Sequence, residues 1–184
     1  MTTSDTAPQQ AGVPVAGRYR LDPAQSSVTF RTRHLFGLGA VSGTMAVTSG
    51  EITVDPAVPH ASVTALLSPA TFDTGSRARD RDVRAAKFLD TDSYPHITFR
   101  AAALTRSAGR WMLAGELTVR DVTSPVTLAI ASVEPAGAGF RARATARIDR
   151  YALGVTAAKG IAARYLDITL TAVAAPAQAP QATR

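Results

Sequence analysis

At 184 residues the chain is long enough for one domain with a buried core, and its 46% apolar and 18% charged residues argue against a wholly disordered protein. The absence of cysteine excludes disulfide bonds, thiolate metal sites and cysteine nucleophiles. The net charge of +6 is typical of nucleic-acid binding, but only Lys87 and Lys159 among the 20 cationic residues are lysine, and a phosphate-binding surface has no physical reason to avoid lysine. We therefore expect no nucleic-acid partner.

The two ends of the chain are predicted to lie outside the folded domain. Residues 1–16 are small and polar, and residues 174–184 mix Ala, Pro and Gln without periodicity, so we expect a disordered leader and tail around one domain at 17–173. The first residues show neither the basic region nor the apolar run of a secretory signal, and no run approaches the length of a membrane helix. These features favour a cytoplasmic protein that does not span a membrane.

Alternation with period two predicts strands through most of the domain. The alternation is clear at 28–34, 111–120, 140–149 and 166–172, and weaker at 41–48, 51–54, 61–68, 96–103 and 126–133. Turn signals separate these runs: Ser49-Gly50, Asp55-Pro56, Ser107-Ala108-Gly109, Ser124-Pro125 and Gly137-Ala138-Gly139. Eight or nine strands at hairpin-like spacing predict an antiparallel barrel or sandwich.

One segment, residues 76–89, breaks this period and predicts a short helix. It is rich in Ala and Arg, with Asp80 and Arg84 one helical turn apart. On a helical wheel Phe88 falls among the charges, so the helix is only weakly amphipathic. We expect it to lie across the barrel without forming a core element.

The arginine-bearing face of each strand must meet water, so the opposite face is the interior. That face combines large and very small side chains: Phe30, Trp111, Phe140, Gly115, Ala142, Ala144 and Ala146. Small and large residues could interdigitate in a filled core, or the small ones could leave room for a ligand, and an eight-stranded barrel allows both. A hollow of this kind would accept a long hydrocarbon chain, because burial contributes about 0.8 kcal/mol per methylene against an association cost of roughly 4–15 kcal/mol.

Four blocks, in order along the chain, resemble the YceI-like family of lipocalin-like polyisoprenoid-binding proteins. They are Leu21 to His34, Phe72-Asp73-Thr74-Gly75 with its continuation to Phe99, Gly115 to Val126, and Ile148 to Val155. The resemblance covers nearly all of 18–173. It implies an all-β protein: an eight-stranded antiparallel lipocalin-like barrel with one short helix near one end. It also implies an apolar lumen for an isoprenoid, quinone or fatty-acyl chain, no catalysis, no cofactor, and a possible homodimer.

Two positions depart from the family pattern. Gln25 stands where the family usually has His, which puts a head-group contact there in doubt. Asp121 stands where the family usually has Gly and could alter a turn, because Asp tolerates a positive φ less well than Gly.

The candidate ligand-binding side chains form two groups. Most would be lumen wall, while His34, Arg79 and Arg150 could contact a polar head at the mouth, since a guanidinium suits phosphate and carboxylate. The alternatives are a His34 bonded to a loop carbonyl and an ion pair of Arg79 or Arg84 with Asp80 that fixes the helix. The full set is Phe30, His34, Phe72, Arg79, Phe88, Phe99, Trp111, Leu117, Ile148, Arg150 and Tyr151.

No motif in the sequence predicts metal binding or catalysis. The three histidines, His34, His60 and His96, have no metal-ligand spacing, and no nucleophile elbow or Gly-rich phosphate loop occurs. We predict non-catalytic carriage or sequestration of a long-chain amphiphile. The alternatives are a barrel enzyme acting on a hydrophobic substrate, which needs a titratable pair deep in the cavity, and a filled barrel acting as a basic binding module.

Overall fold

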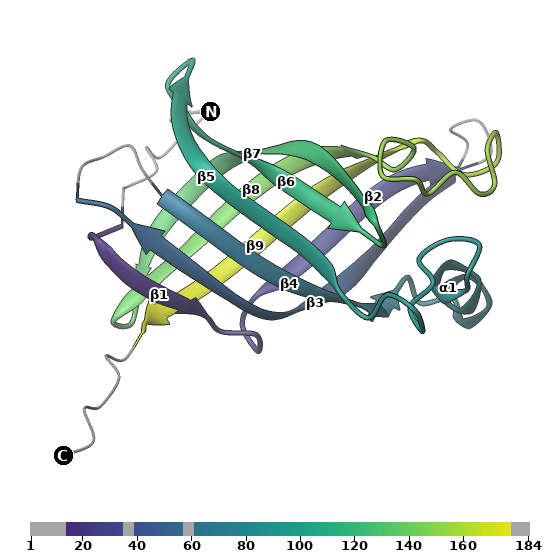
Figure 1. The fold of residues 1–184 in the computed structure, drawn as a ribbon, viewed down its shortest axis with the longest axis horizontal. Helices are drawn as coiled ribbons and strands as arrows, with labels where there is room; N and C mark the ends of the chain where they lie inside the picture. The colour runs from purple at the N-terminus through teal and green to yellow at the C-terminus, as the bar shows by residue number, and fades with distance from the viewer. Residues whose placement is uncertain (1–13, 35–38, 57–60, 178–184) are drawn as a thin grey trace, which may run out of the picture.

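The structure, a computed structural model, describes residues 14–34, 39–56 and 61–177, with the side chains of Arg33 and His34 left out. Within these residues the chain forms nine strands and one helix, which Figure 1 shows as an elongated barrel with the helix beside one end. The strands are β1 (Gly17–Leu21), β2 (Ser27–His34), β3 (Gly39–Val54), β4 (Ala61–Asp73), β5 (Ile97–Ser107), β6 (Arg110–Val119), β7 (Val122–Ala136), β8 (Gly139–Asp149) and β9 (Tyr165–Pro176), and the helix is α1 (Arg77–Arg84).

Hydrogen bonding closes the sheet into a barrel. The strands follow the order β1-β3-β2-β9-β8-β7-β6-β5-β4, all antiparallel, and β4 pairs back with β3. β1 and β2 both lie between β3 and β9: β1 pairs with 51–54 and 174–176, and β2 with 39–46 and 167–171. These two strands share one position in the ring, so the ring has eight positions. The predicted eight-stranded antiparallel barrel with one short helix is confirmed.

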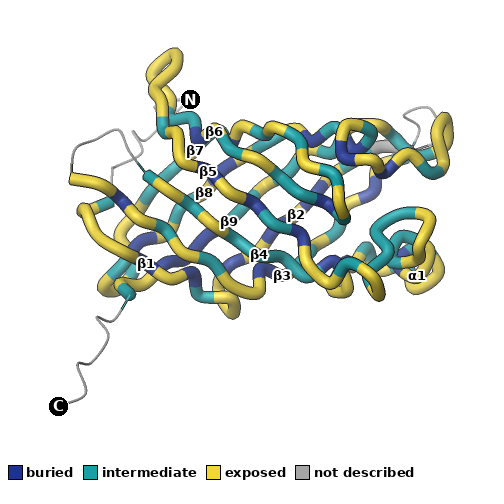
Figure 2. Tube along the Cα trace, viewed as in Figure 1, coloured by how far each residue is buried: buried dark blue, intermediate teal, exposed yellow. Residues whose placement is uncertain are grey.

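The period-two alternation of the sequence places arginines outside and apolar residues inside. On β8, Arg141, Arg143 and Arg147 are exposed, whereas the alternating Phe140 and Ala144 are buried. Figure 2 shows the same succession of buried and exposed residues along the other strands. The cost of burying an unpaired guanidinium fixes which face of each strand turns inward.

Two predicted turns lie inside strands. Ser49 and Gly50 belong to β3, beside a register shift in its pairing with β4. A Cβ on Gly50 would lie 2.7 Å from the Thr64 carbonyl oxygen, so this glycine serves a close approach of two strands.

The Ser124-Pro125 pair lies within β7, opposite Glu116 and Leu117 of β6. The register of β7 with β8 starts only at Ala129. Pro125 therefore lies where β7 pairs with β6 but, in the described register, not with β8. A missing N–H costs fewer inter-strand hydrogen bonds there than in a part of the strand that is paired on both sides.

β9 continues beyond residue 174, where the sequence predicted the tail to begin. Ala174 is 1% exposed and pairs with Leu21 and Phe140. The folded domain thus includes the first residues of the Ala-rich end. The remaining predicted termini, 1–13 and 178–184, lie outside the described residues.

The helix is shorter than predicted. α1 follows Ser76, which has an extended N-cap conformation, and ends at Arg84 because Ala85 is extended, with φ −67° and ψ 164°. Phe88 then turns inward and packs against the buried cluster around Ile97. The expectation that Phe88 lies among charges was wrong, because the helical wheel was extended past the end of the helix. α1 itself places no residue in the buried apolar clusters.

Candidate functional site

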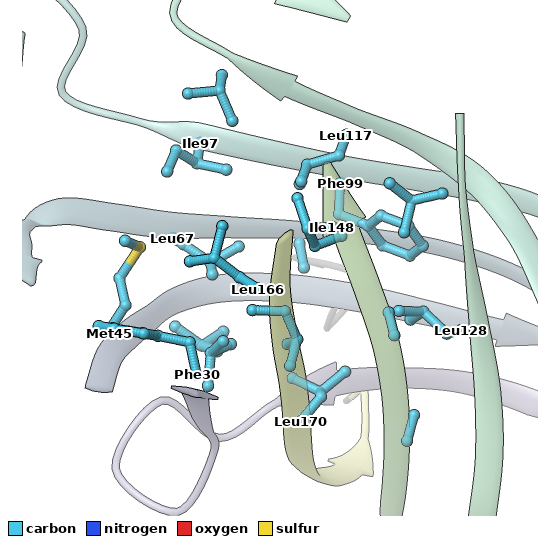
Figure 3. A pocket seen from close by; sticks show the side chains of 18 of the residues that line it. Phe30, Met45, Leu67, Ile97, Phe99, Leu117, Leu128, Ile148, Leu166 and Leu170 are labelled. Atoms are coloured by element: carbon cyan, nitrogen blue, oxygen red, sulfur yellow. The ribbon is translucent and has the colours of Figure 1, made fainter. Parts of the chain in front are cut away.

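An apolar cavity of about 770 Å³ occupies the barrel interior and receives side chains from every strand named above. Figure 3 shows aliphatic and aromatic side chains from several strands pointing into it. Those labelled are Phe30, Met45, Leu67, Ile97, Phe99, Leu117, Leu128, Ile148, Leu166 and Leu170, all of which line the cavity.

The interior is hollow rather than filled. Leu166, Ile168 and Leu170 face the barrel interior and line the cavity, yet each is only partly buried. In a filled core such residues would be fully covered by facing side chains. Ala142, Ala144 and Ala146 of β8 line the same space. Of the two alternatives drawn from the sequence, the one in which small residues leave the lumen open therefore holds.

Nine of the eleven predicted side chains line this cavity: Phe30, Phe72, Arg79, Phe88, Phe99, Trp111, Leu117, Ile148 and Arg150. Tyr151 lies instead in the loop that follows β8, with its ring against the Arg150 and Lys159 cations. The His34 side chain lies outside the described residues. The part that any of these residues plays in binding a ligand stays a prediction.

The charged lining residues are gathered near one end. In the described part of the chain they are Arg79 and Asp82 of α1 and Arg150, which follows β8. Figure 1 places α1 and the loop after β8 at the same end of the barrel. The remaining wall is almost entirely apolar, so the cavity has one polar end.

Arg150 anchors the loop of residues 151–164. Arg150 is 8% exposed, and its guanidinium donates four hydrogen bonds to backbone carbonyl oxygens. The acceptors are Ala163 (2.8 Å), Val155 (2.6 Å), Ala157 (2.8 Å) and Ala162 (3.0 Å). Burial lowers the pKa of Arg150 from its ordinary value. With its donors committed in this way, Arg150 positions the loop rather than offering a free cation to a head group.

The helix charges do not form the predicted ion pair. The buried carboxylate of Asp80 accepts hydrogen bonds from the Thr74 backbone N–H (3.0 Å) and hydroxyl (2.6 Å). The Thr74 hydroxyl bond is the largest cause that lowers the pKa of Asp80. Arg79 donates from Nε to the Thr74 hydroxyl (2.7 Å), and Arg84 donates to the Phe72 carbonyl. Asp80 and both arginines thus tie α1 to the end of β4.

The Arg79 guanidinium is the lining cation with donors to spare. Its Nε and Nη2 bond to Thr74, while its Nη1 makes no hydrogen bond to any other described residue. Asp82, nearby on α1, is 3.5 Å from the Lys87 ammonium in an exposed ion pair.

The two departures from the family pattern have local consequences only. Gln25 lies in the exposed turn between β1 and β2, where its amide donates to the Asp22 carboxylate at 2.6 Å. In the β6–β7 turn the left-handed conformation falls on Arg120, with φ +57°, and not on Asp121. The aspartate therefore needs no positive φ.

Sequence reasoning missed the lining residues outside the clear alternations. Met45 and Leu67 lie on strands whose alternation is weak or interrupted by a bulge. The alternation that remains around each residue is the one sequence signal that could have indicated an inward side chain. Val83 in α1, Leu89 after it and Ile161 in the 151–164 loop also line the cavity and have no period-two signal.

Two further properties concern only the described residues. No group of three or more His, Asp or Glu side chains there could hold a metal ion. None of the helical residues there forms a segment long and apolar enough to cross a bilayer.

Comparison with known proteins places this geometry in a family. The YceI-like domain profile matches residues 19–174. Protein YceI of Shigella flexneri is 35% identical over 121 residues, which cover 64% of this chain and 63% of that protein, so the match spans less than two thirds of the relative.

Two solved structures share the fold. Burkholderia cenocepacia BcnA superposes with a TM-score of 0.71 at 23% identity, covering 83% of this chain and 98% of that one. A polyisoprenoid binding domain from Saccharophagus degradans superposes with a TM-score of 0.62 at 11% identity, covering 86% and 98%. Since the family profile matches nearly the whole barrel and well over half of the chain, the chain belongs to the YceI-like family.

Proposed function

We propose that this protein binds a long-chain amphiphile in the barrel lumen without catalysis, and so carries or sequesters it. The observation that carries the proposal is the apolar cavity of about 770 Å³ with polar groups at one end. Such a wall selects its ligand by shape and desolvation, because it offers almost no hydrogen bonds along the chain.

The cavity volume limits the buried part of the ligand. Its 770 Å³ corresponds to about 25 water-sized groups at roughly 30 Å³ each. Imperfect packing reduces this to about twenty carbon atoms, or about four isoprene units. A longer chain would leave carbons outside the mouth.

A chain of this length can bind with useful affinity. About twenty carbons at about 0.8 kcal/mol each give a gross gain of about 16 kcal/mol, against an association cost of roughly 4–15 kcal/mol. One isoprene unit, at about 4 kcal/mol, would not repay that cost. The lumen therefore favours prenyl, quinone-tail or fatty-acyl chains over small apolar molecules.

The polar end of the ligand belongs at the α1 end of the barrel. Arg79 lines the cavity there and has Nη1 for a phosphate or carboxylate oxygen. Arg150 is less suited, because backbone carbonyls already accept four of its hydrogen bonds. The predicted contribution of His34 remains part of the proposal.

The rival function is an enzyme acting on a hydrophobic substrate. It needs a titratable pair deep in the cavity to transfer protons or attack a bond. The ionisable groups among the described lining residues, Arg79, Asp82 and Arg150, belong to α1 and to the start of the loop after β8, at one end of the barrel (Figure 1). The description of the Saccharophagus degradans structure as a polyisoprenoid binding domain also supports binding over catalysis.

Organic extraction followed by mass spectrometry tests the proposal. Protein purified without detergent is extracted, and a second sample is incubated with a prenol or a fatty acid and re-isolated. We expect an amphiphile with a chain of about twenty carbons or more from the first sample, or uptake by the second. Recovery of no amphiphile together with no uptake would refute the proposed function.

A further inference from the structure

The 151–164 loop forms an amphipathic surface at the polar end of the cavity. Ala158, Ile161, Ala162 and Ala163 of this loop line the cavity. Ile161 is nevertheless 64% exposed, and Tyr165, where the loop ends, is 41% exposed. An apolar side chain that borders the lumen and also faces outward is suited to contact the source of an apolar ligand.

The loop itself carries only cationic side chains, and the two aspartates that flank it, Asp149 and Asp167, lie on the adjoining strands. Residues 150–166 include Arg150, Lys159 and Arg164 but no Asp or Glu. The preceding Asp149 is held by Arg164 through a two-pronged ion pair, with Nη2 at 2.6 Å from the carboxylate. The exposed Lys159 therefore lies beside the apolar part of the loop without a carboxylate partner among the described residues, whereas the charge of Arg164 is balanced by Asp149.

Tyrosine rings accompany these cations. The Lys159 ammonium lies 5.1 Å from the centre of the Tyr151 ring, and the Arg164 guanidinium lies 5.2 Å from the centre of the Tyr165 ring. Tyrosine, lysine and arginine all combine an apolar body with a polar tip, and tyrosine is enriched at membrane–water interfaces. The composition is that of an interfacial surface.

The loop is also held in place before any partner arrives. The buried Arg150 guanidinium donates to four loop carbonyls. A loop that is already ordered presents Ile161 outward without a further ordering cost on docking.

We infer that the 151–164 loop docks on anionic lipid bilayers and connects the membrane to the lumen. Ile161 would enter the interfacial region while Lys159 contacts anionic head groups. The inference rests on the proposed function, because a chain of about twenty carbons leaving a membrane through water would expose its entire apolar surface. Direct contact between this end of the barrel and the bilayer would let the chain pass into the lumen without crossing water.

Flotation of the full chain with vesicles tests this surface. The vesicles contain phosphatidylcholine alone or equal parts of phosphatidylcholine and phosphatidylglycerol. Lys159→Glu and Ile161→Ser are the test variants. Arg110→Glu is the matched control: it changes the net charge equally at an exposed site on the β5–β6 hairpin, at the other end of the barrel in Figure 1.

We expect the unaltered protein to float with the anionic vesicles and to be released by salt. Lys159→Glu should weaken this binding roughly thirtyfold, since each charge near such a surface changes affinity about fivefold. Ile161→Ser should weaken it about tenfold, and Arg110→Glu less than about twofold. Absence of vesicle binding, equal binding to neutral vesicles, or equal losses for Lys159→Glu and Arg110→Glu would overturn the inference.

A second measurement separates this inference from the proposed function. Uptake of a fluorescent polyene fatty acid is followed in vesicle-free buffer, where the lumen alone is tested. We expect Lys159→Glu to take it up as the unaltered protein does, because Lys159 is outside the cavity wall. Normal uptake without vesicle binding would refute only the docking surface, whereas vesicle binding without uptake would refute the lumen as a ligand site.

Discussion

Replacing Ala146 with phenylalanine would place an aromatic ring inside the lumen. Ala146 lies on β8 opposite Ile168, lines the cavity and is only partly buried. The substitution adds about six carbons to the wall and so displaces about six carbons of ligand. At about 0.8 kcal/mol each this removes about 5 kcal/mol of binding, a loss of more than a thousandfold for a chain that fills the cavity.

The same substitution distinguishes a hollow barrel from a filled one by stability. In a well-packed core the extra ring would force neighbouring side chains aside and cost about 1–3 kcal/mol. In the hollow lumen it gains contacts without displacing a neighbour. We therefore expect the free energy of unfolding of Ala146→Phe to equal or exceed that of the unaltered protein.

Fluorescence titration with a chain of about twenty carbons and one of about ten, together with urea unfolding, provides the assay. The control is Ala114→Phe, which adds the same ring to an exposed site on β6. Only the interior variant should lose affinity, and it should lose more for the longer chain. Destabilisation of Ala146→Phe by 1–3 kcal/mol with unchanged ligand affinity would refute the reasoning.

Three other predictions concern the frame around the lumen. Arg150→Lys should lower the free energy of unfolding in urea by about 2–4 kcal/mol, because a single ammonium cannot serve four carbonyls; a change below about 0.5 kcal/mol would contradict this. The hydrogen bonds from Thr74 keep the pKa of Asp80 below its unfolded value of about 3.9, so the stability from this carboxylate is complete above that pH and is lost as the pH falls through the folded pKa. The melting temperature of Asp80→Asn should therefore fall less between about pH 5 and pH 2 than that of the unaltered protein, and parallel curves would argue against it. Gly50→Ala should cost about 1–3 kcal/mol in the same urea assay, because its Cβ would lie 2.7 Å from the Thr64 oxygen, and unchanged stability would show that the two strands are not so close.

The barrel was predictable because its strands alternate polar side chains that must meet water with apolar side chains that must avoid it. On β8, arginines alternate with small or apolar residues, and exposure of one set requires burial of the other. The same alternation pointed to Phe30, Leu117 and Ile148, which line the cavity. Whether the row of alanines on β8 faced packed side chains or space depended on the opposite strands, whose register the alternation does not give.

The polar end was less predictable because loops carry no period. The helix ends at Arg84 without a Gly or Pro to mark the end, so the inward turn of Phe88 has no local signal. Arg150 was a reasonable head-group candidate from its parity along β8. Its true partners, carbonyls as far along the chain as Ala163, come from the path of a loop that sequence patterns do not specify.

The most direct test of the account is a titration with saturated fatty acids from about 10 to about 24 carbons, read as dissociation constant against chain length. An apolar lumen of about 770 Å³ predicts affinity that tightens by up to about 0.8 kcal/mol per added carbon and levels off near twenty carbons, when further carbons remain outside. Affinity that is undetectable at every length, or that does not change with length, would contradict a hollow barrel built to hold an apolar chain.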